Sequence, residues 1–305
     1  MKQKIKITPI ILMVGLTCIL SFILFNKTII AKAVNKGEKN KINIVLESSR
    51  HNKVVPKRLR KTTSLSTIEN REDLNLEGLN TLNISGSQQF TPNNIELLIT
   101  GIDTDLPITV VDLREESHGF VNGSAISFTN DRNNPNKGLS REEVLLDEKT
   151  RLSELKLGEQ LTFFNKPFLT LEVDKIKTEE ELTKEYGLNY VRITVTDKTM
   201  PKDEMVDYFI EFANSLEEEN WLHFHCKHGV GRTSTFMIMF DIMKNHKISK
   251  LEDIINRQLA MYPFKEDTID NYLSQGTVKF LNNFYNYVKE NSDDYKVKWS
   301  EYNKK

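Results

Sequence analysis

Cysteine is nearly absent from this chain of 305 residues, which contains only Cys18 and Cys226. Cys18 lies in an apolar N-terminal run, so a chain that loses this run keeps a single thiol. One thiol excludes an internal disulfide. In an exported protein the remaining cysteine is therefore buried, bonded to another molecule or chemically reactive, and its sequence neighbours indicate which of these applies.

A long membrane-spanning run is also lacking. A span needs about 20 apolar residues, and the uncharged run Pro9–Phe25 is shorter. This run follows a basic start and precedes an A-x-A pattern at 31–33. The order predicts a secretory signal peptide over 1–33 and a secreted or cell-surface protein. An uncleaved anchor is the alternative, and only in that case would a membrane be a partner.

An excess of either charge is missing as well, because the net charge is -1 at pH 7. The overall charge therefore indicates no nucleic-acid partner, and any site for a polyanion has to be local. Composition shifts divide the chain after the signal peptide into a basic linker over 34–55, one domain over 56–295 and a polar tail over 296–305. We find no internal repeat and no low-complexity tract.

Hydrophobic patterns in the domain alternate between strand and helix periods. Short apolar runs predict buried strands at 108–111, 190–195 and 221–225. An apolar face over 205–213 predicts a helix, and the stretch 236–240, apolar on all sides, predicts a buried one. Strands that alternate with helices predict an α/β core. The β-type runs within 156–176 predict a small β-rich part beside it.

The segment His225-Cys226-Lys227-His228-Gly229-Val230-Gly231-Arg232-Thr233-Ser234 lies between a predicted strand and the buried helix. Its two glycines allow backbone N–H groups to turn inward, and the following helix directs its N-terminus to the same point. Arg232 can bind two phosphate oxygens at once. The same positive field favours a thiolate at Cys226. The segment therefore predicts an anion-binding loop with a reactive nucleophile.

Two simpler interpretations of this segment are weaker. A buried structural cysteine does not need the surrounding glycines and arginine. A nucleotide-binding P-loop would end in Gly-Lys-Ser/Thr, which is absent here. A thiolate that displaces an alkoxide also needs a proton donor. Asp197, in the loop after the predicted strand 190–195, is the candidate. Taken alone it would be better explained as an ordinary turn residue, but the nucleophile segment favours the catalytic role.

These residues resemble the phosphate-binding loop of protein tyrosine phosphatases, and in particular the tyrosine-phosphatase-like cysteine phytases, or inositol polyphosphate phosphatases. Further segments resemble family signatures: Pro56–Arg60, Ile84–Ser87, Val111–Gly123, Tyr190–Ile193 with Thr196-Asp197, and Trp221–Cys226. The resemblance covers about 56 to 240. The stretch from Asp112 to Gly123 is not typical of ordinary tyrosine phosphatases and separates the subfamilies.

The resemblance implies an α/β protein tyrosine phosphatase-like core, a central sheet flanked by helices, with a small partial β-barrel that includes about 156–176. It implies that Cys226 is the nucleophile, Arg232 the phosphate clamp and Asp197 the general acid. Thr233 would hydrogen-bond the thiolate, and His225 would position the loop. Members of this family need no metal, so no cofactor is expected.

Substrate binding is expected from the loop residues Lys227, His228, Gly229, Val230 and Gly231, and from Lys198. The family usually has His directly after the acid, so Lys198 is a departure that keeps the charge but does not titrate near neutral pH. Arg58, in the basic cluster 57–61, is a further candidate. The alternative for these charges is a solvated surface.

The resemblance implies a secreted phosphomonoesterase that hydrolyses myo-inositol hexakisphosphate (phytate) stepwise through a phosphocysteine. A protein tyrosine phosphatase that acts on extracellular or host phosphoproteins uses the same chemistry and is the first alternative. A non-catalytic phosphate-binding module is an alternative of another class, but it has no use for Cys226 and Asp197. A phosphoinositide lipid phosphatase is a further alternative if the N-terminal run remains as an anchor.

Overall fold

The computed structural model describes residues 42–64, 66, 68–216, 219–291 and 295–304. The signal peptide predicted over 1–33 and the first part of the predicted linker lie outside these residues. In the part of the chain that is described, no helix is both long and apolar enough to cross a membrane.

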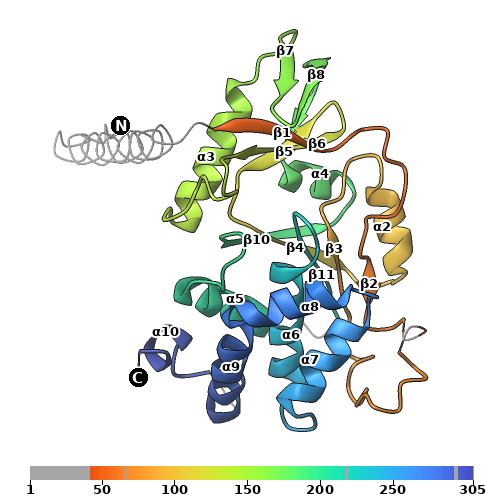
Figure 1. Ribbon diagram of the computed structural model, residues 1–305, viewed down its shortest axis with the longest axis vertical. Helices are drawn as coiled ribbons and strands as arrows, with labels where there is room; N and C mark the ends of the chain where they lie inside the picture. Colours follow the sequence, from red (N-terminus) through yellow and green to blue (C-terminus); the bar gives the residue numbers. More distant parts are fainter. Residues whose placement is uncertain (1–41, 65, 67, 217–218, 292–294, 305) are drawn as a thin grey trace, which may run out of the picture.

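A five-stranded sheet with the order β10-β4-β11-β3-β2 forms the centre of the molecule (Figure 1). Its strands are β2 (Arg60–Lys61), β3 (Ile84–Gln88), β4 (Ile108–Arg114), β10 (Asn189–Val195) and β11 (Trp221–Cys226). The four longer strands are parallel and β2 is antiparallel. Every residue of β4 and β11 is buried, as expected for parallel strands covered on both faces. The carboxyl ends of the parallel strands share one edge, where ligand sites of α/β sheets form.

Helices cover both faces of this sheet. One face carries α5 (Asp203–Ser215), α6 (Gly231–Asn245), α7 (Leu251–Ala260), α9 (Val278–Asn291) and α10 (Trp299–Tyr302). The other face carries α2 (Ile95–Ile102) and α4 (Glu179–Glu185). Between α7 and α9 lie α8 (Glu266–Tyr272) and a π-helical turn, Leu273–Thr277. The predicted α/β core, its three strands and its two helices are confirmed.

A second, four-stranded antiparallel sheet has the order β1-β6-β5-β9 and lies beyond the carboxyl end of β4, where Arg114 is 2.8 Å from Glu47 of β1 (Figure 1). It consists of β1 (Asn43–Ser48), β5 (His118–Val121), β6 (Ser124–Thr129) and β9 (Ile176–Lys177). Helix α3 (Arg141–Glu154), which begins with a capping box formed by Ser140 and Glu143, packs against it. The hairpin β7 (Gln160–Phe163) and β8 (Lys166–Glu172) adjoins it. Among the described residues this part is an open sheet with a hairpin, which matches a partial barrel rather than a closed one.

Two predicted boundaries need correction. The linker predicted over 34–55 is wrong for β1, because this strand pairs with β6 and Val45 is buried. The polar tail predicted over 296–305 is also wrong, because Trp299 in α10 is buried among aromatic rings and its Nε1 donates a 2.8 Å hydrogen bond to Asp203. Both segments are short, and contacts with distant parts of the chain order them.

Candidate active site

Cys226 ends strand β11, and the backbone turns through four residues before α6 begins at Gly231. Two donors point at its sulfur: the backbone N–H of Gly229, at 3.3 Å, and the Thr233 hydroxyl, at 3.2 Å. The sulfur belongs to a free thiol, and only 3% of the residue is exposed. Both donors, and the N-terminus of α6 that follows the loop, therefore present positive potential to the sulfur.

The two glycines of the loop, Gly229 and Gly231, differ in backbone conformation and in the space around them. Gly229 has φ +70°, and a Cβ built on it would lie 2.4 Å from the backbone nitrogen of Gln88, so only glycine fits. A Cβ on Gly231 would meet nothing within 4 Å. The structure therefore requires glycine at position 229 but not at position 231.

Glu116 accepts two hydrogen bonds from Arg232 and holds it in place. No role was predicted for Glu116 from the sequence. Arg232 Nη1 donates to Glu116 Oε2 at 2.7 Å, and Nη2 donates to Oε1 at 3.0 Å. Burial opposes ionisation of Glu116, but Arg232 and then Arg114 outweigh it and hold the pKa of this carboxyl well below its usual range. This bidentate pair fixes one edge of the guanidinium and leaves Nε for a ligand.

Asp197 lies in the loop after β10, opposite the nucleophile loop. Its Oδ1 is 3.2 Å from Arg232 Nη2, and its Oδ2 accepts a 3.1 Å hydrogen bond from Asn133 Nδ2. The side chain is only partly buried, with 18% exposed. The carboxyl therefore shares one pocket with Cys226 and Arg232.

This pocket has a volume of about 450 Å³, within the usual range for small-molecule sites. Nine of its lining residues were singled out from the sequence: Arg58, Asp197, Lys198, Cys226, Lys227, His228, Val230, Gly231 and Arg232. The sequence analysis missed the others: Asn133, Thr199, Met200, Thr268, Asn271 and Tyr272. The predicted residues His225, Gly229 and Thr233 are buried and do not line the pocket.

Two cationic residues at the mouth of the pocket have strained backbone conformations. Arg58 and Lys198 have φ values of 63° and 61°, in the left-handed region that side chains rarely adopt. Neither has a carboxylate partner in the part of the chain that the structure describes. Lys227, in contrast, is 3.2 Å from Glu47 of β1. Burial and then Lys227 lower the pKa of His228, so this imidazole is less readily charged than a free one.

The loop is also supported from below by Arg60, a buried residue of the cluster 57–61. Its Nη1 donates to the carbonyl of Gly229 at 3.0 Å, and its Nη2 donates to the Ser234 hydroxyl at 3.1 Å. Arg58 Nη1 donates to the carbonyl of His228 at 2.9 Å. The cluster 57–61 is thus not simply a solvated surface, because Arg58 and Arg60 both bind the backbone of the loop.

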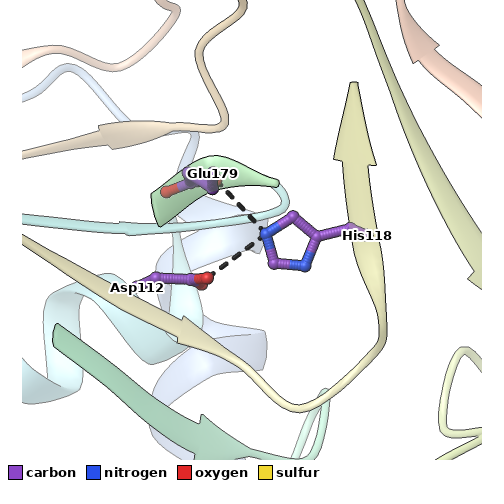
Figure 2. Close-up of side chains that lie close together, drawn as sticks. All are labelled: Asp112, His118 and Glu179. Atoms are coloured by element: carbon purple, nitrogen blue, oxygen red, sulfur yellow. Dashed lines mark hydrogen bonds and ion pairs between the residues drawn. The ribbon is translucent and has the colours of Figure 1, made fainter. Parts of the chain in front are cut away.

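Behind the loop, His225 belongs to a buried group of ionisable side chains. Its Nε2 lies 2.6 Å from Glu179 Oε1 of α4. Figure 2 shows that His118 Nε2 faces both Glu179 and Asp112, at 3.2 Å from each carboxylate. We call Asp112, His118 and Glu179 the buried triad. Burial opposes ionisation of Glu179, but His225 and the hydrogen bond from His118 together lower the pKa of this carboxyl to about 2.

The buried triad offers three ligand atoms within 4.8 Å of one another, a spacing that suits a metal ion. Its charges are already balanced, however. Arg192 Nη1 is 2.8 Å from Asp112 Oδ2. Burial and Arg114 oppose the charged form of His118, but Asp112 and Glu148 raise its pKa to about 9. Asp112 and Glu179 therefore already have cationic partners, and a divalent ion would have to displace a tightly held proton from His118. We interpret the triad as a support for the loop.

Comparisons with known proteins agree with this geometry. The model of the PTP-like phytase family, whose description is inositol hexakisphosphate, matches residues 111–244. A PTP-like myo-inositol phosphatase from Mitsuokella multacida, solved with myo-inositol-(1,3,4,5)-tetrakisphosphate, superposes with a TM-score of 0.76 at 30% identity. That match covers 87% of this chain and 48% of the Mitsuokella protein. Effector protein hopD2 of Pseudomonas syringae pv. tomato is 28% identical over 75% of this chain and 53% of its own length. The chain thus spans about half the length of these two relatives.

A PTP-like phytase from Bdellovibrio bacteriovorus matches over nearly its whole length. The alignment covers 87% of this chain and 96% of the Bdellovibrio protein, with 30% identity and a TM-score of 0.69. Likeness at this level over an entire relative is sufficient to assign membership. The chain belongs to the PTP-like phytase family.

Proposed function

We propose that this protein is a cysteine-dependent phosphomonoesterase that hydrolyses inositol polyphosphates through a phosphocysteine at Cys226. One observation carries the proposal: a free thiol with two donors lies in a pocket with Arg232 and a carboxyl from an opposing loop. A nucleophile, a clamp for phosphate and a proton donor are the three parts that such a reaction needs.

In the first half-reaction the Cys226 sulfur attacks phosphorus. The S–P bond forms as the P–O bond to the inositol breaks. Arg232 binds the phosphoryl oxygens through its Nε edge, while Glu116 holds the other edge in place. The N-terminus of α6 adds a positive field at the same point. Both contacts strengthen as negative charge builds up on the transferring group.

Asp197 is the proton carrier in both half-reactions. It gives a proton to the leaving inositol oxygen, which would otherwise depart as a strongly basic alkoxide. The ionised carboxylate then accepts a proton from the water that attacks phosphorus. The S–P bond breaks in that step, and phosphate and the Cys226 thiolate are released. The Thr233 hydroxyl, at 3.2 Å, stabilises the departing thiolate.

The pocket mouth supports an inositol polyphosphate as substrate. Arg58 and Lys198 present positive charge away from the scissile phosphate, where the other phosphates of such a ligand would lie. The tetrakisphosphate complex of the Mitsuokella relative supports the same substrate class. We propose myo-inositol hexakisphosphate as the first substrate to test, with stepwise removal of its phosphates.

We also propose that the protein is exported and that cleavage follows Ala33. This part of the proposal rests on the sequence of residues 1–33, which lie outside the described structure. After such cleavage Cys226 would be the sole cysteine, which suits a free catalytic thiol in an oxidising compartment. Mass spectrometry of the protein recovered from culture medium tests the cleavage site directly.

The activity is tested by phosphate release from inositol hexakisphosphate and from a phosphotyrosine peptide, across pH 4 to 8 and with a chelator present. Cys226→Ser serves as the blank. We expect strong preference for the inositol substrate. Preference for the peptide would keep the roles of Cys226, Arg232 and Asp197 but would assign the protein to phosphoprotein substrates. Turnover by Cys226→Ser would remove the proposed nucleophile.

A further inference from the structure

Asn133 is placed by the small sheet between the two loops of the active site. It follows β6 in a loop that Asn130 stabilises, because Asn130 Oδ1 accepts from the backbone N–H of Arg132 at 3.2 Å and of Asn134 at 3.0 Å. The backbone N–H of Asn133 also donates to the carbonyl of Asn130 at 3.0 Å. Asn133 itself has φ 53°, a strained conformation that its surroundings must maintain.

The contacts of the Asn133 amide fix its orientation. Lys227 Nζ, which can only donate, lies 3.3 Å from Oδ1, and the Thr129 hydroxyl lies 3.0 Å from the same atom. The oxygen of the amide is therefore turned toward Lys227. Its nitrogen must then face Asp197, where Nδ2 is 3.1 Å from Oδ2. Asn133 thus donates to the carboxyl that we propose as the proton carrier.

We infer that Asn133 is a positioning residue that holds the Asp197 carboxyl in place in the pocket that it shares with Cys226. The inference rests on the proposed function. With Arg232 Nη2 3.2 Å from Oδ1 and Asn133 at Oδ2, both carboxylate oxygens have a partner. A hydrogen bond to the charged form of a carboxyl favours that form. The ionised form is the one that accepts a proton from water in the second half-reaction.

Other groups that carry charge, or can carry it, line the same pocket as Asp197. They are Arg232 from α6, Lys227 and His228 from the nucleophile loop, and Lys198 from its own loop. All of them are cations or can become cations. Asn133, in contrast to these residues, carries no charge. Its removal therefore leaves the surrounding charges in place and takes away one donor to Asp197 together with one acceptor for Lys227.

Two substitutions separate this role from a merely structural one. Asn133→Gly removes the amide but accepts the left-handed backbone. Asn133→Asp keeps the shape but brings a second carboxylate next to Asp197. Asn83→Gly is the matched control, because Asn83 also has a left-handed backbone, at φ 51°, and does not line the pocket.

The measurement is kcat and KM for inositol hexakisphosphate as functions of pH, in the full chain and its variants. We expect Asn133→Gly to lower kcat by about 10-fold to 100-fold with little change in KM, because the carboxyl is no longer held in position. The alkaline limb of kcat/KM, which reports the protonated acid of the free enzyme, should move upward by roughly one pH unit. It should move further upward in Asn133→Asp, and it should not move in Asn83→Gly.

An alkaline limb that stays in place in both Asn133 variants would overturn the inference, even if their rates fall. A limb that moves equally in Asn83→Gly would also overturn it, because the shift would then come from the backbone. Failure of the proposed function looks different: the unmodified enzyme would release no phosphate from the inositol substrate.

Discussion

The active-site pocket and the buried triad contain the same kinds of side chain but differ in how their charges are balanced. In the triad, Asp112, His118 and Glu179 are almost completely buried, and each has an oppositely charged neighbour. In the pocket, Arg58 and Lys198 have no carboxylate partner among the described residues. A charge is costly to bury without a partner, whereas a cation that is accessible to water needs no protein partner and can bind a ligand. Charge balance therefore separates a supporting cluster from a binding site better than residue type does.

The largest effect should follow from the removal of the nucleophile. We expect Cys226→Ser to lower kcat on inositol hexakisphosphate by on the order of 10⁴-fold or more, because a neutral hydroxyl is a far weaker nucleophile than a thiolate. The pocket cations remain, so the substrate should still bind. Calorimetric titration of the variant measures that affinity, and loss of binding together with turnover would place Cys226 in the fold rather than in the chemistry.

The second effect concerns the acid in the pocket. Asp197→Asn should slow hydrolysis of inositol phosphates by about 10² to 10⁴, the range for a general acid–base catalyst. Formation of the phosphocysteine should be affected less for p-nitrophenyl phosphate, because its leaving group departs without a proton. Rapid-quench measurement of the first turnover compares the two substrates. Equal losses in this step would assign the proton transfer to another residue.

Local segments of the active site could be predicted from the sequence, and its long-range contacts could not. The loop from Cys226 to Arg232 is contiguous and lies between a strand and a helix, so periodicity and the position of the glycines located it. Glu116 holds Arg232 from 116 residues away, and no spacing rule connects these positions. Glu116 lies within the quoted signature segment Val111–Gly123, which is the only sequence signal that could have drawn attention to it.

The same limit explains the errors at the chain ends and in the pocket wall. Strand β1 and helix α10 are too short to show a clear period, and each is ordered by packing against a distant segment. Tyr272 and Asn271 reach the pocket because α8 folds back over the nucleophile loop. By contrast, β4 and β11 of the central sheet are mostly apolar, because both of their faces are buried. Their positions could therefore be predicted.

The third predicted effect is a pH-dependent change in the unfolding free energy, which comes from His118 in the buried triad. Since the folded pKa of His118 is about 9 and lies above the usual 6.5, its charged form stabilises the fold below pH 6.5. This contribution is lost as the pH rises from 6.5 through 9. We expect the unfolding free energy of the unmodified protein, relative to His118→Gln, to fall by about 3 kcal/mol across this window. Urea unfolding at pH 6, 7.5 and 9 measures the difference, and a constant difference would mean that His118 is neutral in the fold.

The smallest effect should come from Lys198, whose exposed charge is screened by water and salt. Lys198→Gln should raise KM for inositol hexakisphosphate by about threefold to fivefold and leave p-nitrophenyl phosphate, with its single phosphate, unchanged. Lys57→Gln is the matched control, because Lys57 is exposed beside Arg58 but does not line the pocket. Lys198→His should behave like lysine at pH 5 and like glutamine at pH 8, since a free imidazole titrates near 6.5. If both substrates respond equally to Lys198→Gln, the cation acts on the scissile phosphate, and the contrast between a paired interior and an unpaired pocket mouth would no longer explain substrate choice.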